Sequence, residues 1–185
     1  MKKIILASKS PRRKQLLELL GYPFEIIVSD IDEKIDSNND LVKEIEKLSY
    51  QKAYAVFKDH QDKMVIGADT IVKIDNEVLG KPKDEQQAKV MLQKLSNNTH
   101  EVVTGVTILT NDSKETFSSI ASVKFCKLSE EEIEEYIKTK EPMDKAGAYA
   151  IQGYGAKFIE KIDGDYYTVM GLPVSKLYHK LQKYI

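Results

Sequence analysis

Short apolar runs alternate with longer amphipathic segments along the 185-residue chain, and this alternation restricts the folds that it can adopt. Strand-like runs cover residues 4–7, 24–28, 64–67, 71–74, 102–109, 117–125 and 158–162. Helical patterns cover residues 11–20, 41–60, 84–95, 130–139 and 174–184. This order predicts an α/β fold. Because two neighbouring strand pairs have only a turn between them, we expect hairpins and hence a mixed sheet.

Charge and cysteine content exclude several classes of function. The 28 basic and 29 acidic residues nearly cancel, so no overall field attracts the chain to nucleic acid or to a membrane. No apolar stretch approaches the roughly 20 residues that a membrane helix needs. A single cysteine, Cys126, rules out an intramolecular disulfide and fits a reducing compartment. We therefore expect a cytoplasmic protein that binds neither nucleic acid nor membrane.

The helix expected to begin at Ser10 and Pro11 has an unusual N-terminus. Arg12, Arg13 and Lys14 crowd an end where the helix dipole already places positive charge, which is unfavourable without a bound anion. Free backbone N–H groups and the Ser-Lys-Ser loop at 8–10 suit a phosphate chain. Helical spacing puts Arg13 on the leucine side, so we expect it to point toward the body of the protein. The alternative is a solvated basic turn.

Two further charged residues occupy positions where apolar side chains are expected. Lys52 falls inside the apolar stripe of the helix over 41–60, so it must snorkel, form a pair or face a polar cleft. Asp69 interrupts a strand-like run of β-branched residues, where aspartate is unfavourable. A buried aspartate that faces a cleft suits a Mg²⁺ ligand or a general base for water. The alternative for Asp69 is a bond to its own backbone.

Three weaker signals accompany these residues. Lys81 lies between Gly80 and Pro82, which hold it in a rigid turn. The segment 141–153 is rich in alanine and glycine, and its Gln152 carries an amide that can pair with a pyrimidine edge. The acidic run at 30–33 either adds a metal ligand or forms a solvated loop. An ordinary turn lysine and a tight packing turn are the alternatives for the first two signals.

The combination of these residues is typical of phosphoryl transfer. Two arginines, two lysines and a buried carboxylate can offset the charge of a phosphate chain and handle water. The chain has no glycine-rich Walker pattern, so it is not a P-loop enzyme.

Several stretches of the chain resemble the Maf family of nucleotide pyrophosphatases, in the family's order. They are residues 6–13, 67–70, 80–82, 104–105, 141–153 and 171–173. The resemblance implies one Maf-like domain over residues 1–185. It also implies an α/β fold related to that of inosine triphosphatase, with two lobes around a strongly curved mixed sheet and a deep cleft. Thr168 departs from the pattern, since many relatives have asparagine there.

The resemblance further implies hydrolysis of dTTP and UTP to the monophosphate and pyrophosphate, with Mg²⁺ or Mn²⁺ and often as a homodimer. Asp69 matches the catalytic acceptor and, with Glu33, the expected metal ligands. The positions that match substrate-binding residues are Ser8, Arg13, Lys52 and Lys81. Those that match the dTTP/UTP branch in base choice are Arg12, Thr70 and Gln152.

Two alternatives stay open from the sequence. The first is the same chemistry on another modified or purine triphosphate. The second is a regulatory binding protein in the arrest of septum formation, which would use the nucleotide site only as a sensor or not at all.

Overall fold

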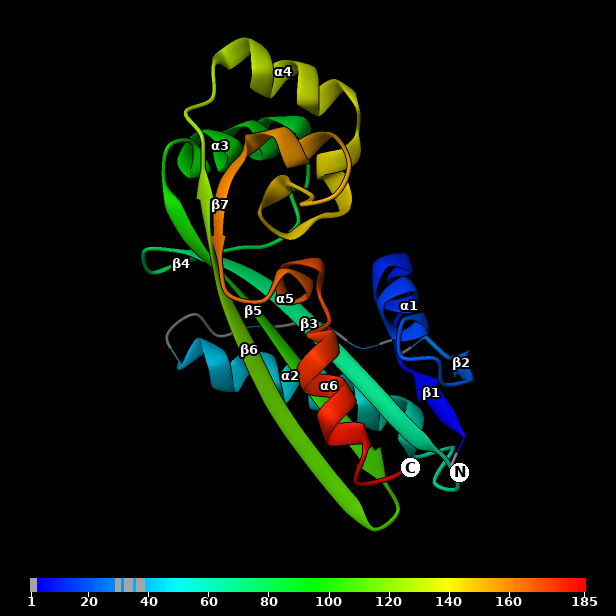
Figure 1. The fold of residues 1–185 in the computed structure, drawn as a ribbon. Helices are drawn as coiled ribbons and strands as arrows, with labels where there is room; N and C mark the ends of the chain where they lie inside the picture. The colour runs from blue at the N-terminus through cyan, green and yellow to red at the C-terminus, as the bar shows by residue number, and fades with distance from the viewer. Residues whose placement is uncertain (1–2, 29–30, 32–34, 36–38) are drawn as a thin grey trace. The chain divides into compact units, whose positions relative to one another are not determined.

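The computed structural model describes residues 3–28, 31, 35 and 39–185, which pack into two compact units (Figure 1). Unit 1 comprises Met1–Thr70, Thr104–Ser119 and Gly171–Ile185. Unit 2 comprises Ile71–Val103 and Ile120–Met170. The prediction of a single domain over residues 1–185 stays a prediction.

Among the described residues, seven strands form one mixed sheet with the order β2-β1-β3-β5-β6-β7, and β4 pairs with β3. The strands are β1 (Ile4–Leu6), β2 (Phe24–Ile26), β3 (Met64–Ile74), β4 (Glu77–Leu79), β5 (Thr99–Thr110), β6 (Ser113–Phe125) and β7 (Ile159–Asp163). β1 runs parallel to β2 and to β3, whereas β4 and β7 lie antiparallel to β3 and β6. The predicted α/β class with a mixed sheet is therefore confirmed.

Several elements differ from the sequence prediction, among them β4 (Glu77–Leu79), which lies outside the predicted strands. The two strand-like runs over 64–67 and 71–74 belong to one continuous strand, β3, so Asp69 lies within a strand and not at a break. The short helix α5 (Tyr166–Met170) was not predicted. It begins after Asp165, whose carboxylate accepts hydrogen bonds from the backbone N–H groups of Tyr167 and Thr168 and from the Thr168 hydroxyl. Thr168, the departure from the family pattern, is thus a buried capping partner.

Unit 1 contains the helices α1 (Pro11–Glu18), α2 (Leu41–Phe57) and α6 (Val174–Leu181). As predicted, Ser10 caps α1 by accepting from the Arg13 N–H, with Pro11 in the first turn, and Asp40 caps α2. The apolar face of α2 packs on the sheet through a core that joins the following side chains: Ile5, Ala7, Ala53, Val56, Val65 and Leu109.

Two glycines allow α2 to lie unusually close to the sheet. A Cβ atom on Gly67 of β3 would stand 2.5 Å from the Ser49 carbonyl oxygen and 2.6 Å from the Ala53 nitrogen. A Cβ atom on Gly105 of β5 would stand 2.7 Å from the Ile45 carbonyl oxygen. Because all three atoms belong to the backbone of α2, no side-chain movement would relieve these contacts. The two glycines therefore determine how closely α2 packs on β3 and β5.

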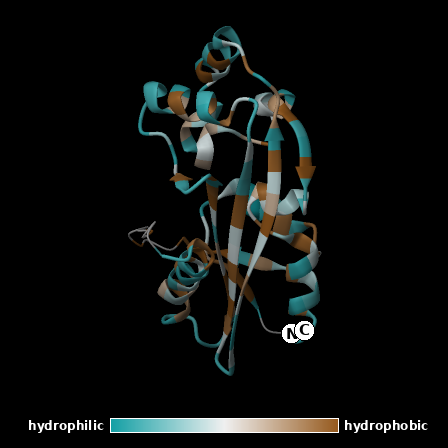
Figure 2. Cartoon of the chain, turned by 90° about the vertical axis from the view of Figure 1, so that its left-hand side faces the viewer, coloured by the Kyte–Doolittle hydropathy of each residue, from teal (hydrophilic) through white to brown (hydrophobic). Residues whose placement is uncertain are grey.

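Unit 2 contains α3 (Glu85–Leu95), α4 (Glu130–Lys138) and the 3₁₀ turns η1 (Glu141–Asp144), η2 (Ala146–Ala148) and η3 (Tyr154–Phe158). α3 and α4 lie side by side (Figure 1). The predicted capping box of Ser129 and Glu132 opens α4. Both helices bury one face, and hydrophilic and hydrophobic residues alternate along them in Figure 2. No helix in the described ranges is both long and apolar enough to cross a membrane.

Candidate active site

The centre of the candidate site is a buried ion pair within unit 1. Lys52 on α2 donates from Nζ to Oδ1 of Asp69 on β3 over 2.6 Å. Their side chains are only 8% and 11% exposed. Of the three outcomes considered for Lys52, the structure shows pairing. Asp69 accepts its hydrogen bond from Lys52 on another element, so the alternative, a bond to its own backbone, is not observed.

Arg13 approaches the same carboxylate from α1. Its Nη2 atom lies 3.9 Å from Asp69 Oδ1 and donates to Thr70 Oγ1 over 3.0 Å. Its Nε atom donates to the Gly171 carbonyl oxygen over 2.9 Å, and Nη1 donates to Ser8 Oγ over 3.4 Å. The guanidinium is therefore directed inward, as helical spacing predicted.

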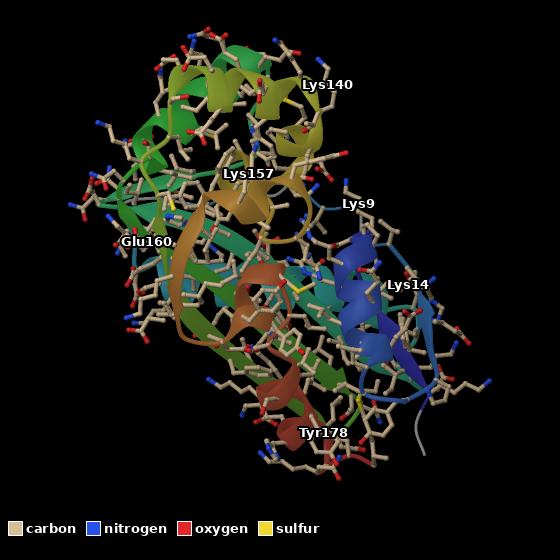
Figure 3. The ribbon with its side chains drawn as sticks, turned by 45° about the horizontal axis from the view of Figure 1, so that its top comes forward. Lys9, Lys14, Lys140, Lys157, Glu160 and Tyr178 are labelled. Carbon is tan, nitrogen blue, oxygen red and sulfur yellow. The ribbon has the colours of Figure 1, made fainter. Side chains whose placement is uncertain are left out.

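The neighbouring cation on α1 behaves differently. Lys14 is half exposed and lies on the outer side of α1 (Figure 3), where it pairs with Glu18 one turn later at 3.8 Å. Such an exposed pair contributes little to stability. The basic N-terminus of α1 thus divides into an inward arginine and a solvated lysine, so each of the two readings of this segment holds for one residue.

A second layer of hydroxyl groups supports Arg13. Thr70 Oγ1 lies 2.9 Å from Oγ1 of Thr104, which is fully buried on β5. Because the Thr70 hydroxyl accepts a hydrogen bond from Arg13, Thr70 helps to hold this arginine in place, in addition to the role in base choice that the family resemblance implies. Sequence reasoning gave Thr104 no role of its own, although Thr104 and Gly105 belong to the stretches that resemble the Maf family. The available signal was a threonine within the strand-like run over 102–109.

The charge of this cluster favours an anion. Arg13 and Lys52 place two cationic side chains beside the carboxylate of Asp69. The helix dipole adds partial positive charge at the N-terminus of α1. A phosphate chain would accept charge-assisted hydrogen bonds from these cations, and such bonds are stronger than neutral ones.

The residues also fit a divalent cation that is shared with a substrate. No group of three or more His, Cys, Asp or Glu side chains gathers in the part of the chain that the structure describes. Asp69 is the carboxylate of the cluster, and its Oδ2 accepts no hydrogen bond from any described residue. Mg²⁺ is commonly held by one or two carboxylates together with substrate phosphates. A single carboxylate oxygen of this kind therefore fits an Mg²⁺ or Mn²⁺ ion whose other ligands come from the substrate and from water.

The structure brings together five of the predicted residues in unit 1: Ser8, Arg13, Lys52, Asp69 and Thr70. Arg12 is half-buried in the first turn of α1. Lys81, between β4 and α3, and Gln152, between η2 and η3, are exposed residues of unit 2. Glu33 lies outside the described residues.

Comparison with known proteins shows which sequences this chain is similar to. The sequence model of the family described as "Maf-like protein" matches residues 3–184. A dTTP/UTP pyrophosphatase of Bacillus cytotoxicus is 52% identical over 184 residues, which cover 100% of this chain and 96% of that protein. A dTTP/UTP pyrophosphatase of Bacillus cereus strain ATCC 10987 is 53% identical, with 100% and 91% covered.

One solved structure shows the same fold at low identity. The Ham1 protein of Staphylococcus aureus matches with a TM-score of 0.53 and 14% identity, and the match covers 100% of both chains. At this identity the likeness concerns the fold alone.

Proposed function

Since this chain belongs to the Maf family, we propose that it is a nucleoside triphosphate pyrophosphatase that converts dTTP and UTP to the monophosphate and pyrophosphate. The full-length similarity to proteins of that name supports the reaction and the substrates. The observation that carries the proposal is the buried cluster of Arg13, Lys52 and Asp69, which joins a phosphate-binding charge to a carboxylate with one open oxygen.

In the proposed reaction, Arg13 and Lys52 bind the phosphate chain near the N-terminus of α1. Both cations reach the site with little exposure to solvent, so their attraction to phosphate is screened less than at the surface. Ser8, 3.4 Å from Arg13 Nη1, holds the guanidinium from one side, and the Gly171 carbonyl holds it from another. Such preorganised donors stabilise the charge that develops on the leaving pyrophosphate. From the family resemblance, Lys81 is assigned to the same phosphates.

Asp69 is proposed to orient water and accept its proton. The bond from Lys52 fixes Oδ1, which leaves Oδ2 with its two lone pairs for the proposed contacts to water and to a divalent cation. The water oxygen attacks the α-phosphorus, the bond to the α–β bridging oxygen breaks, and pyrophosphate leaves with that oxygen. A divalent cation on Asp69, with Glu33 proposed as a further ligand, would neutralise phosphate charge.

Base choice is proposed to depend on Arg12, Thr70 and Gln152. The family resemblance supports all three assignments. The structure adds that the Thr70 hydroxyl is bonded to Arg13 and Thr104, so a change at Thr70 also acts on the guanidinium. A homodimer stays a prediction from the resemblance.

The test is pyrophosphate release from a panel of canonical and modified nucleoside triphosphates, with Mg²⁺, Mn²⁺ or EDTA. We expect metal-dependent release that is strongest for dTTP and UTP. Asp69→Asn should lower kcat by at least about 10²-fold, since it removes the proton acceptor. Asp75→Asn, in the exposed turn after β3, is the matched control and should retain activity.

Each contrary result points to a separate error. Release from a different nucleotide would keep the reaction and reject the base assignment. Near-normal turnover by Asp69→Asn would reject the role of Asp69. No release from any triphosphate would reject the enzyme and favour the regulatory alternative.

A further inference from the structure

The segment that carries Gln152 is tied to two residues that the proposed chemistry does not use. It runs between α4 and β7 in unit 2, and Figure 3 labels Lys140 and Lys157 near its two ends. Tyr136, on the buried face of α4, and Glu141, the first residue of η1, hold this segment by side-chain contacts.

The contacts form a closed set. The Tyr136 hydroxyl donates to Glu141 Oε1 over 2.8 Å and accepts from the Ala150 N–H over 3.1 Å. Glu141 Oε1 also accepts from the Gly155 N–H over 3.0 Å, and Oε2 accepts from the Tyr154 N–H over 2.9 Å. The segment is thus held at residue 150 on one side of Gln152 and at residues 154 and 155 on the other.

The backbone follows this carboxylate so closely that it needs glycine. Gly153 has a φ of +87°, and a Cβ atom there would stand 2.3 Å from Glu141 Oε2. A Cβ atom on Gly155 would stand 2.8 Å from the Tyr136 hydroxyl oxygen and 2.5 Å from the Ala150 carbonyl oxygen. Glycine removes both clashes and permits the positive φ. The chain therefore passes directly over the two side chains.

Tyr136 is rigidly held. It is 1% exposed, and its ring packs edge-on against Phe158 at 5.0 Å between centroids. Its hydroxyl group therefore has a fixed position from which to orient Glu141. Hydrogen bonds to a carboxylate are shorter and stronger than neutral ones, so the Glu141 contacts restrain the segment more firmly than a neutral acceptor would.

Gln152 itself has no comparable restraint. Its side chain is exposed, and the structure shows no hydrogen bond between it and any other described residue. An exposed amide without such a hydrogen bond is available to a ligand, and its location depends on the backbone on either side. In this chain, that backbone is held by Tyr136 and Glu141.

We propose that Tyr136 and Glu141 form a clamp that positions Gln152 for base recognition, and that both are specificity-determining positioning residues. This inference rests on the proposed role of Gln152 in base choice. A held amide presents its donor and acceptor in one orientation, whereas a mobile amide adapts to several bases. Loss of the clamp should therefore reduce discrimination between bases more than it reduces turnover.

The experiment measures kcat and KM for UTP and for CTP with Tyr136→Phe, Glu141→Gln and Gln152→Ala. Tyr136→Phe keeps the ring and removes the hydroxyl. Glu141→Gln removes the charge and places an amide nitrogen against an N–H donor. We expect both to lower the UTP/CTP ratio of kcat/KM by about tenfold, mainly through KM for UTP, because a hydrogen-bonding contact sets such ratios.

A double variant separates positioning from a general structural effect. If the clamp acts through Gln152, Tyr136→Phe should not lower the ratio further in a Gln152→Ala background, since the two changes remove one interaction. Ser96→Ala is the matched control. The Ser96 hydroxyl accepts from the Leu128 N–H over 2.8 Å in the same unit, as the Tyr136 hydroxyl does from Ala150. Ser96→Ala should leave the ratio unchanged.

Failure of the clamp and failure of the proposed function give different results. A ratio that is lost in Gln152→Ala but kept in both clamp variants overturns the inference alone. A ratio that survives in Gln152→Ala overturns the base-reading role of Gln152, and with it the inference. Equal losses in Tyr136→Phe and Ser96→Ala would identify a general loss of packing and would also overturn it.

Discussion

Gly67→Ala tests whether close packing of α2 on the sheet positions the catalytic pair. The added Cβ atom would meet the Ser49 carbonyl oxygen at 2.5 Å, whereas an ordinary contact begins at 3.4 Å. The contact with the Ser49 oxygen is therefore too short by roughly 0.9 Å, and the contact of the same Cβ atom with the Ala53 nitrogen, at 2.6 Å, is similarly short. Because the obstacle is helix backbone, α2 must move away from β3.

The magnitude follows from that displacement. Overpacking of this kind costs about 1–3 kcal/mol of unfolding free energy. For a chain of this size, that corresponds to a fall in Tm of roughly 2–12 °C. Lys52 lies on the displaced helix, so a movement of ~0.9 Å would stretch its bond of 2.6 Å to Asp69 beyond the ideal range. A misplacement of about 1 Å can lower kcat/KM by about 10²-fold.

Thermal denaturation and pyrophosphate release measure the two effects separately. Gly80→Ala is the matched control for stability, because its Cβ atom meets nothing within 4 Å and its φ is not positive. We expect Gly67→Ala to lower both Tm and kcat/KM, and Gly80→Ala to leave Tm nearly unchanged. A Gly67→Ala variant with wild-type Tm and wild-type kcat/KM would refute the argument.

Two further predictions concern a buried hydroxyl and a buried imidazole. Thr104→Val should raise KM for UTP several-fold by releasing Thr70 and Arg13, and Thr104→Ser should restore the wild-type KM. Thr107 is a buried threonine on the same strand, so Thr107→Val is the matched control and should leave KM unchanged. An equal rise of KM in both valine variants would contradict the positioning role of Thr104. Burial lowers the pKa of His100 from 6.5 to about 4, so the unfolded chain gains this proton at higher pH than the folded protein. Stability from His100 is complete above pH 6.5 and should fall by up to about 1.4 kcal/mol per pH unit toward pH 4. Urea denaturation across that range should show a shallower loss in His100→Gln, and identical slopes would reject this assignment.

Local patterns predicted most of the helices and strands, and they singled out the charged residues Lys52 and Asp69. Ser10 and Pro11 fix the start of α1, and the distance of three residues from that cap turns Arg13 inward. Lys52 stands out because it breaks the apolar stripe of a helix, and Asp69 because it interrupts a run of β-branched residues typical of a strand. A charge in such a position needs a partner, so the sequence alone indicates that these residues are unusual.

The partners of those residues depend on contacts between distant segments. Arg13 reaches the Gly171 carbonyl 158 residues later, and Thr70 reaches Thr104 on another strand. No periodicity within either segment contains this information. The clamp of Tyr136 and Glu141 also depends on contacts that the sequence does not reveal. Glu141 accepts three hydrogen bonds in the structure, but in the sequence it is an ordinary acidic residue after a helix. Short-range reasoning finds the anomalous residue but not the group that satisfies it.

Stability does not account for the pair of Lys52 and Asp69. Desolvation of two charges offsets much of their attraction, and apolar side chains of similar volume at such sites are often as stabilising or more so. The fold also places Gly67 beneath α2, although glycine within a strand weakens it. Both features are unfavourable for stability alone, yet the cluster brings a lysine, an arginine and a carboxylate to one point. A phosphate chain would accept charge-assisted hydrogen bonds from the lysine and the arginine, so the arrangement fits the proposed phosphate site better than a purely stabilising role.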